Sequence, residues 1–197
     1  MNILHVISSP RTDSYSHRLG NAIIEKLLAA HPGSTVRERN LAEHPFPHLE
    51  EASIQSFNTP ADQHTPGQQA AIRRSDEVIA EVQDAEVLVV DAPLYNFSIP
   101  STLKAWIDHL ARRGVTFRYT ANGPEGLLKD KKVYVAMASG GVYSEGPAAG
   151  YDFVAPYLRT IFGFLGLTDV TIARAEGVAN PELEPTAIQK GLESVSV

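Results

Sequence analysis

The chain contains 197 residues, of which 43% are hydrophobic and 20% are charged, and it carries a formal net charge of −6 with no cysteine. This length favours one domain whose core needs no covalent cross-links. The absence of cysteine excludes disulfides, thiolate zinc sites, cysteine nucleophiles and dithiol redox chemistry. The acidic net charge argues against a nucleic-acid partner, because proteins that bind nucleic acids carry a basic stripe on their surface. If this protein moves electrons, a bound cofactor must carry them.

The N-terminal residues 1–7 lack the basic segment and the cleavage site of a signal peptide. No apolar run reaches the roughly 18 residues that a membrane-spanning helix needs. We therefore expect a cytoplasmic protein without a membrane span. No repeat or linker divides the sequence, so we expect residues 1–197 to form a single domain.

Apolar periodicity predicts strands and helices in alternation along the chain. The run Val87–Val90 is unbroken and largely β-branched, which is typical of a parallel strand covered on both faces. The predicted strands cover residues 2–7, 35–41, 85–92, 133–138 and 170–175. The predicted helices start at a cap at Ser14 or Ser16, at 67, at 100 and at 151, with a short last one near 181 or 185.

Two stretches interrupt this alternation. Residues 42–66 contain scattered prolines and read as a surface excursion with a short helix near 50–57; one hypothesis for them is a lid over the binding pocket. Residues 115–128 read as a hairpin or extended loop, with Asn122-Gly123-Pro124 as the turn.

Five strand–helix units indicate an α/β domain with a mainly parallel sheet. Connections of this kind are right-handed, and five strands favour the flavodoxin-like order 2-1-3-4-5 with helices on both faces. Ligands of such sheets bind outside the carboxyl ends of the strands. Three loops that leave those ends therefore matter most.

The first of these loops, residues 8–16, has the composition of an anion cradle. Ser9, Ser14 and Ser16 offer hydroxyl donors, and the helix that begins near Tyr15 presents unpaired N–H groups and a positive dipole end. The loop has neither a nucleotide P-loop lysine nor the G-x-G-x-x-G fingerprint, so a terminal phosphate monoester held without metal fits best. The alternative is an ordinary loop with a capping serine.

The second loop contains Leu94, Tyr95, Asn96 and Phe97 directly after the most buried strand. Aromatic rings and exposed amides suit a flat heterocycle, because rings supply apolar contact while amides hydrogen-bond its edge. The alternative is aromatic packing between helix and sheet.

The third loop contains Ala138, Ser139, Gly140 and Gly141, and its glycines let the backbone approach a ligand closely. The alternative is a simple turn. A flavin explains all three loops together, with its phosphate in the first loop and its ring across the other two.

Other chemistries find little support. Of the seven histidines, His44 and His48 have helical spacing, but Pro45 and Pro47 forbid that helix, and the others are scattered, so we predict no metal site. Ser139 lies outside a G-x-S-x-G nucleophile elbow. Response-regulator phosphotransfer needs an acidic cluster where Ser8-Ser9 stands, and a phosphatase of this fold would need a cysteine.

Three segments also carry a family resemblance. They are Asp91–Pro100 with Leu103–Asp108 behind it, Thr116–Thr120 followed by Asn122–Pro124 and Gly126-Leu127, and Pro156–Leu158 leading into Phe162–Gly166. These motifs resemble the FMN-dependent NADH azoreductases, also called FMN-dependent NADH:quinone oxidoreductases. The likeness extends from Ile3 to about Gly177.

The resemblance implies FMN bound by the three loops, namely by Ser9, Ser14, Tyr15, Ser16, Leu94, Tyr95, Asn96, Phe97, Ala138, Ser139, Gly140 and Gly141. It implies two-electron transfer from NADH or NADPH to quinones, and cleavage of azo compounds, by a ping-pong mechanism. It further implies a homodimer with the flavin at the interface. Candidates to line the substrate pocket are Phe117, Tyr119, Tyr143, Phe162 and Phe164.

Two departures from the family pattern touch the third loop. The family's loop reads serine-arginine-glycine-glycine, whereas this chain has Ala138-Ser139-Gly140-Gly141, and Tyr143 stands where relatives often have histidine. The hypothesis from a different class is a non-catalytic flavodoxin-like electron carrier or partner-binding module. Direct bleaching by NADH separates the enzyme from the carrier.

Overall fold

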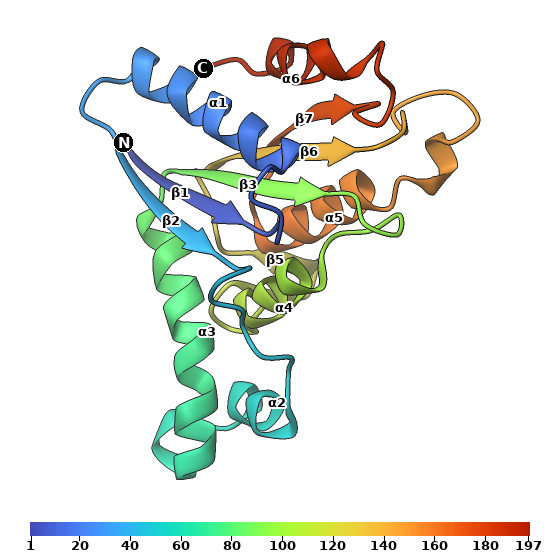
Figure 1. Cartoon of the computed structure of the whole chain (residues 1–197). Helices are drawn as coiled ribbons and strands as arrows, with labels where there is room; N and C mark the ends of the chain where they lie inside the picture. The colour runs from blue at the N-terminus through green and yellow to red at the C-terminus, as the bar shows by residue number, and fades with distance from the viewer.

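A computed structural model describes residues 1–197 as alternating strands and helices (Figure 1). The elements are β1 (Asn2–Ile7), α1 (Tyr15–Ala30), β2 (Thr35–Asn40), α2 (Glu51–Asn58), the 3-10 turn η1 (Ala61–Gln63), α3 (Pro66–Asp84), β3 (Val87–Pro93), α4 (Ser101–Leu110), β4 (Phe117–Thr120), β5 (Gly123–Gly126), β6 (Lys132–Ser139), the 3-10 turn η2 (Ala149–Tyr151), α5 (Val154–Leu165), β7 (Asp169–Glu176) and α6 (Glu184–Glu193). Each strand and helix predicted from periodicity is present, with ends that move by a few residues.

Five parallel strands form the main sheet in the order β2-β1-β3-β6-β7. All seven residues of β3 are buried, because this strand has neighbours on both sides and helices on both faces. Counted among the sheet strands alone the order is the predicted 2-1-3-4-5. The numbering differs because β4 and β5 form a separate two-stranded ribbon. The flavodoxin-like α/β architecture is therefore confirmed.

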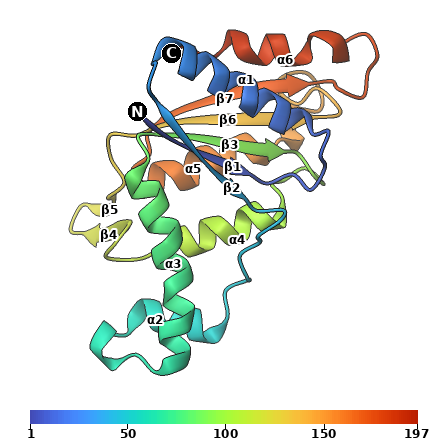
Figure 2. The same cartoon turned by 60° about the vertical axis from the view of Figure 1, so that its left-hand side comes forward.

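Helices cover both faces of the sheet. α1 and α6 lie on one face, and α3, α4 and α5 lie on the other (Figures 1 and 2). Each face has its own hydrophobic cluster: the larger contains Trp106 and Phe162, both fully buried, and the smaller contains Leu19 and Ile23 of α1. The apolar stripes read from the sequence are the faces that these helices bury.

The 42–66 excursion forms α2 and η1 and packs beside the N-terminal half of α3, at one end of the molecule (Figure 2). Its first residues, Ala42 and Glu43, line cavities near the carboxyl edge of the sheet. The helix predicted near 50–57 is confirmed, but the segment does not close over that edge of its own chain.

The β4–β5 ribbon is the hairpin predicted for residues 115–128, although its two-residue turn is Ala121-Asn122 and not Asn122-Gly123-Pro124. The ribbon packs on the C-terminal end of α5, where Leu128 donates its N–H to the Leu165 carbonyl oxygen over 2.9 Å. Because helices in a parallel α/β sheet run back against the strands, this end of α5 lies at the amino edge of the sheet (Figure 2).

The long helix α3 begins with a capping box. The Thr65 hydroxyl accepts from the Gln68 N–H over 3.3 Å, the Gln68 side chain accepts from the Thr65 N–H over 2.8 Å, and Pro66 is the first helical residue. We expect Thr65→Ala to lower the free energy of unfolding by about 1 kcal/mol, measured by urea denaturation.

Thr160→Ala is the matched control, because Thr160 is an exposed threonine inside α5 with no capping role. It should change stability by about 0.5 kcal/mol or less. Equal losses of stability in the two variants would show that the capping box adds nothing.

No helix of the chain combines the length and apolarity that crossing a membrane requires.

Candidate functional site at the carboxyl edge of the sheet

The three loops singled out in the sequence meet at the carboxyl edge of the sheet. They enclose a hollow of about 70 Å³. It is lined by Arg11, Ser14, Tyr15, Pro93, Leu94, Tyr95, Ala138, Ser139, Gly140 and Val178. The parallel pairing of β1, β3 and β6 accounts for this convergence, because each loop leaves the same end of its strand.

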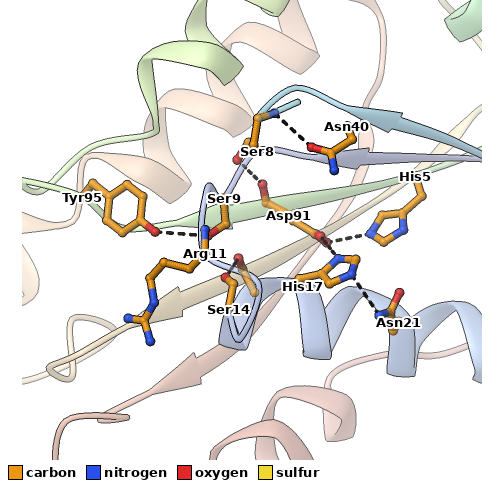
Figure 3. Close-up of polar contacts among 12 residues, drawn as sticks. His5, Ser8, Ser9, Arg11, Ser14, His17, Asn21, Asn40, Asp91 and Tyr95 are labelled. Carbon is orange, nitrogen blue, oxygen red and sulfur yellow. Dashed lines mark hydrogen bonds and ion pairs between the residues drawn. The ribbon is translucent and has the colours of Figure 1, made fainter. Parts of the chain in front are cut away.

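The first loop keeps its serine hydroxyls buried and paired with one another or with the second loop. The Ser14 and Ser16 hydroxyls lie 2.8 Å apart, and the Ser9 hydroxyl lies 3.1 Å from that of Tyr95 (Figure 3). Ser14 precedes α1, yet no side chain caps this helix. The N–H groups of the first turn therefore stay open, and together with the hydroxyls and the helix dipole they offer donors and positive potential to an anion.

Two further side chains of the first loop, Tyr15 and Arg11, form polar contacts, one with the last helix and one within the loop. The Tyr15 hydroxyl donates a hydrogen bond to the Glu184 carboxylate of α6, which raises the pKa of Tyr15 above its usual value. Arg11 forms a bidentate pair with Asp13, and both side chains are exposed. Tyr15 thus joins the start of α1 to the last helix of the chain.

The second loop is a tight turn held in an uncommon backbone conformation. Tyr95 and Ser98 exchange two backbone hydrogen bonds of 2.9 and 3.0 Å, and between them Asn96 and Phe97 have φ values of 50° and 69°. Positive φ at both central positions is the geometry of a type I′ turn, which costs energy in residues other than glycine. Phe97, in the centre of this turn, is 44% exposed.

Backbone hydrogen bonds from the segment after β7 hold the third loop. Gly177, Val178 and Ala179 donate their N–H groups to the carbonyl oxygens of Gly141, Ser139 and Gly140, over 3.1 to 3.2 Å. A Cβ added at Gly140 would meet nothing closer than 3.5 Å, so no protein atom needs this space. The surface at Gly140 remains free for a ligand, whereas at Gly141 the Tyr143 ring would lie 3.3 Å from an added Cβ.

An aromatic rim borders the site. Phe97 lies edge-on to Tyr143, with ring centroids 6.3 Å apart, and 5.4 Å from Tyr151. Tyr151 and Phe153 are each more than half exposed, and Phe153 donates its N–H to the Phe97 carbonyl oxygen over 3.1 Å. The sequence analysis did not single out these two residues, because it placed them in the helix predicted from 151, whereas Tyr151 ends the turn η2 and Phe153 precedes α5.

The other pocket candidates lie elsewhere. Phe162 is fully buried in the core between α5 and the sheet, so the expectation that it lines a pocket is wrong for this chain. Phe117 and Tyr119 belong to β4 at the amino edge, where Phe117 packs on Phe164 with centroids 4.6 Å apart. These residues do not reach the carboxyl-edge site of their own chain, because α4 carries the backbone to the other edge before β4 begins.

A buried polar cluster that the sequence analysis missed lies under the first loop. One Asp91 carboxylate oxygen is 3.0 Å from His5 Nε2, and the other is 3.0 Å from His17 Nδ1 (Figure 3). These three groups, of which the sequence analysis considered only the histidines, also have the chemistry of metal ligands, and their ligand atoms lie within 4.8 Å of one another. The hydrogen bond to Asp91 raises the pKa of His17 above its usual value. The available signal was a polar residue inside each of two largely apolar strands, His5 in β1 and Asp91 in β3.

Comparison with known proteins assigns this chain to a family. Residues 1–196 match the family model described as flavodoxin-like fold. An FMN-dependent NADH:quinone oxidoreductase of Aromatoleum aromaticum is 56% identical over 180 residues, which is 91% of this chain and 89% of that protein. The chain belongs to this family.

Solved structures of azoreductases agree with this family assignment. An azoreductase from Bacillus anthracis strain Sterne has a TM-score of 0.91 at 33% identity, with 98% of this chain and 95% of that chain covered. An FMN-dependent NADH-azoreductase from Bacillus anthracis strain Ames Ancestor, solved in complex with FMN, has a TM-score of 0.86 at 27% identity, with 98% and 97% covered. The resemblance read from the central motifs is confirmed.

Proposed function

We propose that this protein is an FMN-dependent oxidoreductase that passes two electrons from NADH to quinones and to aromatic azo compounds. The observation that carries the proposal is the convergence of the three loops on one hollow, in a chain 56% identical to a protein named FMN-dependent NADH:quinone oxidoreductase. The proposal takes residues 1–197 as a single flavin-binding domain.

The residues present fit FMN. The uncapped start of α1 and the hydroxyls of Ser9, Ser14 and Ser16 would hold its phosphate, because N–H groups and hydroxyls donate to phosphate oxygens without a metal. The open glycine surface of the third loop and the turn at Asn96-Phe97 would hold its ring. When bound, FMN supplies the acceptance of a hydride and its return to a second substrate.

The chain's own contribution is binding and orientation. Phe97, Tyr143 and Tyr151 would stack on flat donors and acceptors in turn, which requires the first product to leave before the second substrate enters and so gives ping-pong kinetics. In a homodimer, a partner subunit could place its β4 aromatic residues beside this rim. No side chain at the site is needed as an obligatory acid, since solvent reaches the open face.

The direct test uses the purified protein. We expect a yellow protein with bound FMN that NADH bleaches anaerobically without a partner reductase, and that a quinone or an azo dye reoxidises. Parallel reduction with NADPH measures the coenzyme preference. A colourless protein that takes up no added FMN would disprove the proposal. A yellow protein that NADH cannot bleach would be an electron carrier.

A further inference from the structure

A buried carboxylate lies directly beneath the loop that we assign to the FMN phosphate. Asp91 in β3 is fully buried, and its backbone carbonyl oxygen accepts from the Ser8 hydroxyl over 2.5 Å. Its two carboxylate oxygens contact His5 of β1 and His17 of α1. Because His17 directly follows Ser16, the cluster joins both ends of the serine loop (Figure 3).

A buried carboxylate needs a positive partner, and His5 does not provide it. The His5 ring is fully buried, and its Nδ1 has no hydrogen-bond partner. A proton on that nitrogen would leave a buried donor unsatisfied, which is costly. His5 therefore carries its single proton on Nε2, donates it to Asp91, and stays neutral.

His17 is the group that can balance the charge. Its side chain is 28% exposed and its Nδ1 donates to Asp91. Its Nε2 lies 3.3 Å from Nδ2 of Asn21, an amide nitrogen that, as placed, donates to an unprotonated Nε2. The carbonyl end of that amide accepts from a protonated Nε2 once the amide is turned by half a rotation. The His5 and His17 rings are stacked at 5.4 Å and 9°, an arrangement that disfavours two positive charges and suits one.

Charges from the other neighbouring elements do not replace this proton. Glu38 on β2 also favours the charged form of His17. Arg11 and Glu43 line the cavity of about 440 Å³ that His17 shares with Ser9, and Arg11 is held by Asp13. Arg18, the next residue of α1, lies over the Tyr15 ring and forms no ion pair with the Asp91 carboxylate.

We propose that FMN binding depends on the proton of His17, which neutralises Asp91 beneath the phosphate loop. With this proton the cluster has no net charge. Without it, the buried carboxylate repels the phosphate, which carries about 1.5 to 2 negative charges near pH 7. The inference rests on the proposed function, since it concerns the same cofactor site.

The sign of the effect follows from the protonated form being the one that binds. FMN binds tightly below the pKa of His17 and more weakly above it, so by linkage bound FMN must raise the pKa of His17. A rise of one pKa unit corresponds to about a tenfold difference between the Kd values of the protonated and deprotonated forms.

The experiment is a titration of the deflavinated protein with FMN, followed by flavin fluorescence between about pH 6.5 and about pH 9. We expect the wild-type Kd to rise about tenfold over this range. His17→Gln should bind weakly at every pH, and His17→Arg, whose charge is permanent, should bind tightly at every pH. Riboflavin, which lacks the phosphate, should bind the wild type with the same Kd at both ends of this pH range.

A second readout does not depend on variants. Nitrogen NMR of the His17 ring should give a higher pKa with FMN bound than with riboflavin bound. An equal pKa in the two complexes, or a wild-type Kd that follows the same pH profile as that of His17→Gln, would overturn the inference. If the protein binds neither flavin at any pH, the proposed function itself fails.

Discussion

Replacing Gly20 by alanine is expected to lower the free energy of unfolding by about 3 kcal/mol, through overpacking and the loss of a buried hydrogen bond. A Cβ at this position of α1 would lie 2.0 Å from one Asp91 carboxylate oxygen and 2.9 Å from His5 Nε2. Asp91 cannot turn aside, because it is fully buried and both of its oxygens are engaged. α1 would have to lift from the sheet, and the serine loop would move with it.

Gly163→Ala is the matched control, because Gly163 also lies inside a helix, α5, and an added Cβ there meets no atom within 4 Å. This variant should gain about 0.5 to 1 kcal/mol from the lower backbone entropy of its unfolded state. Urea denaturation of the two variants measures the difference. If Gly20→Ala were as stable as the wild type, the close packing of α1 on Asp91 would be disproved.

The double substitution Ser14→Ala and Ser16→Ala is expected to raise the Kd for FMN by at least about 100-fold. A hydrogen bond to a charged group contributes about 1.5 to 3 kcal/mol, and two such bonds to the phosphate would be lost. These two hydroxyls pair with each other at 2.8 Å, so removing both leaves neither without a partner inside the protein. The protein should therefore fold normally and lose only the affinity for phosphate.

Two comparisons isolate that effect in the same fluorescence titration. Riboflavin should bind the double variant about as well as the wild type. Ser75→Ala removes another buried serine hydroxyl, which donates to the His109 carbonyl oxygen over 2.7 Å in the α3–α4 contact, and it should leave the Kd for FMN unchanged. An FMN affinity that survives the double substitution would place the phosphate elsewhere.

Much of the fold could be predicted because burial leaves a local pattern. The apolar run Val87–Val90 predicted a doubly covered strand, and β3 is buried along its whole length. The stripe of α1, with Leu19 and Ile23, predicted the face that packs on the sheet. Helix ends were less certain: α5 begins at Val154, three residues after its predicted start, because Tyr151 ends a separate 3-10 turn.

Only part of the candidate site could be predicted from the sequence. The three loops were identified by composition, and the parallel topology brings them to one edge. Phe162 was misplaced because an aromatic residue within a helical stripe looks the same whether it faces a core or a pocket. Phe117 and Tyr119 lie at the opposite edge of the sheet, a consequence of the path of α4 that no local pattern encodes.

The absence of cysteine determined, from the sequence alone, that any redox chemistry must rest on a bound cofactor, and the strand–helix alternation predicted the edge of the sheet at which the three loops meet. Only the tertiary structure decided how a chain with a net charge of −6 arranges charge beneath an anion site. His5 and Asp91 are 86 residues apart, and they meet because β1 and β3 pair while α1 lies across them. Periodicity records how deeply each residue is buried, but it does not record which distant residues share that burial.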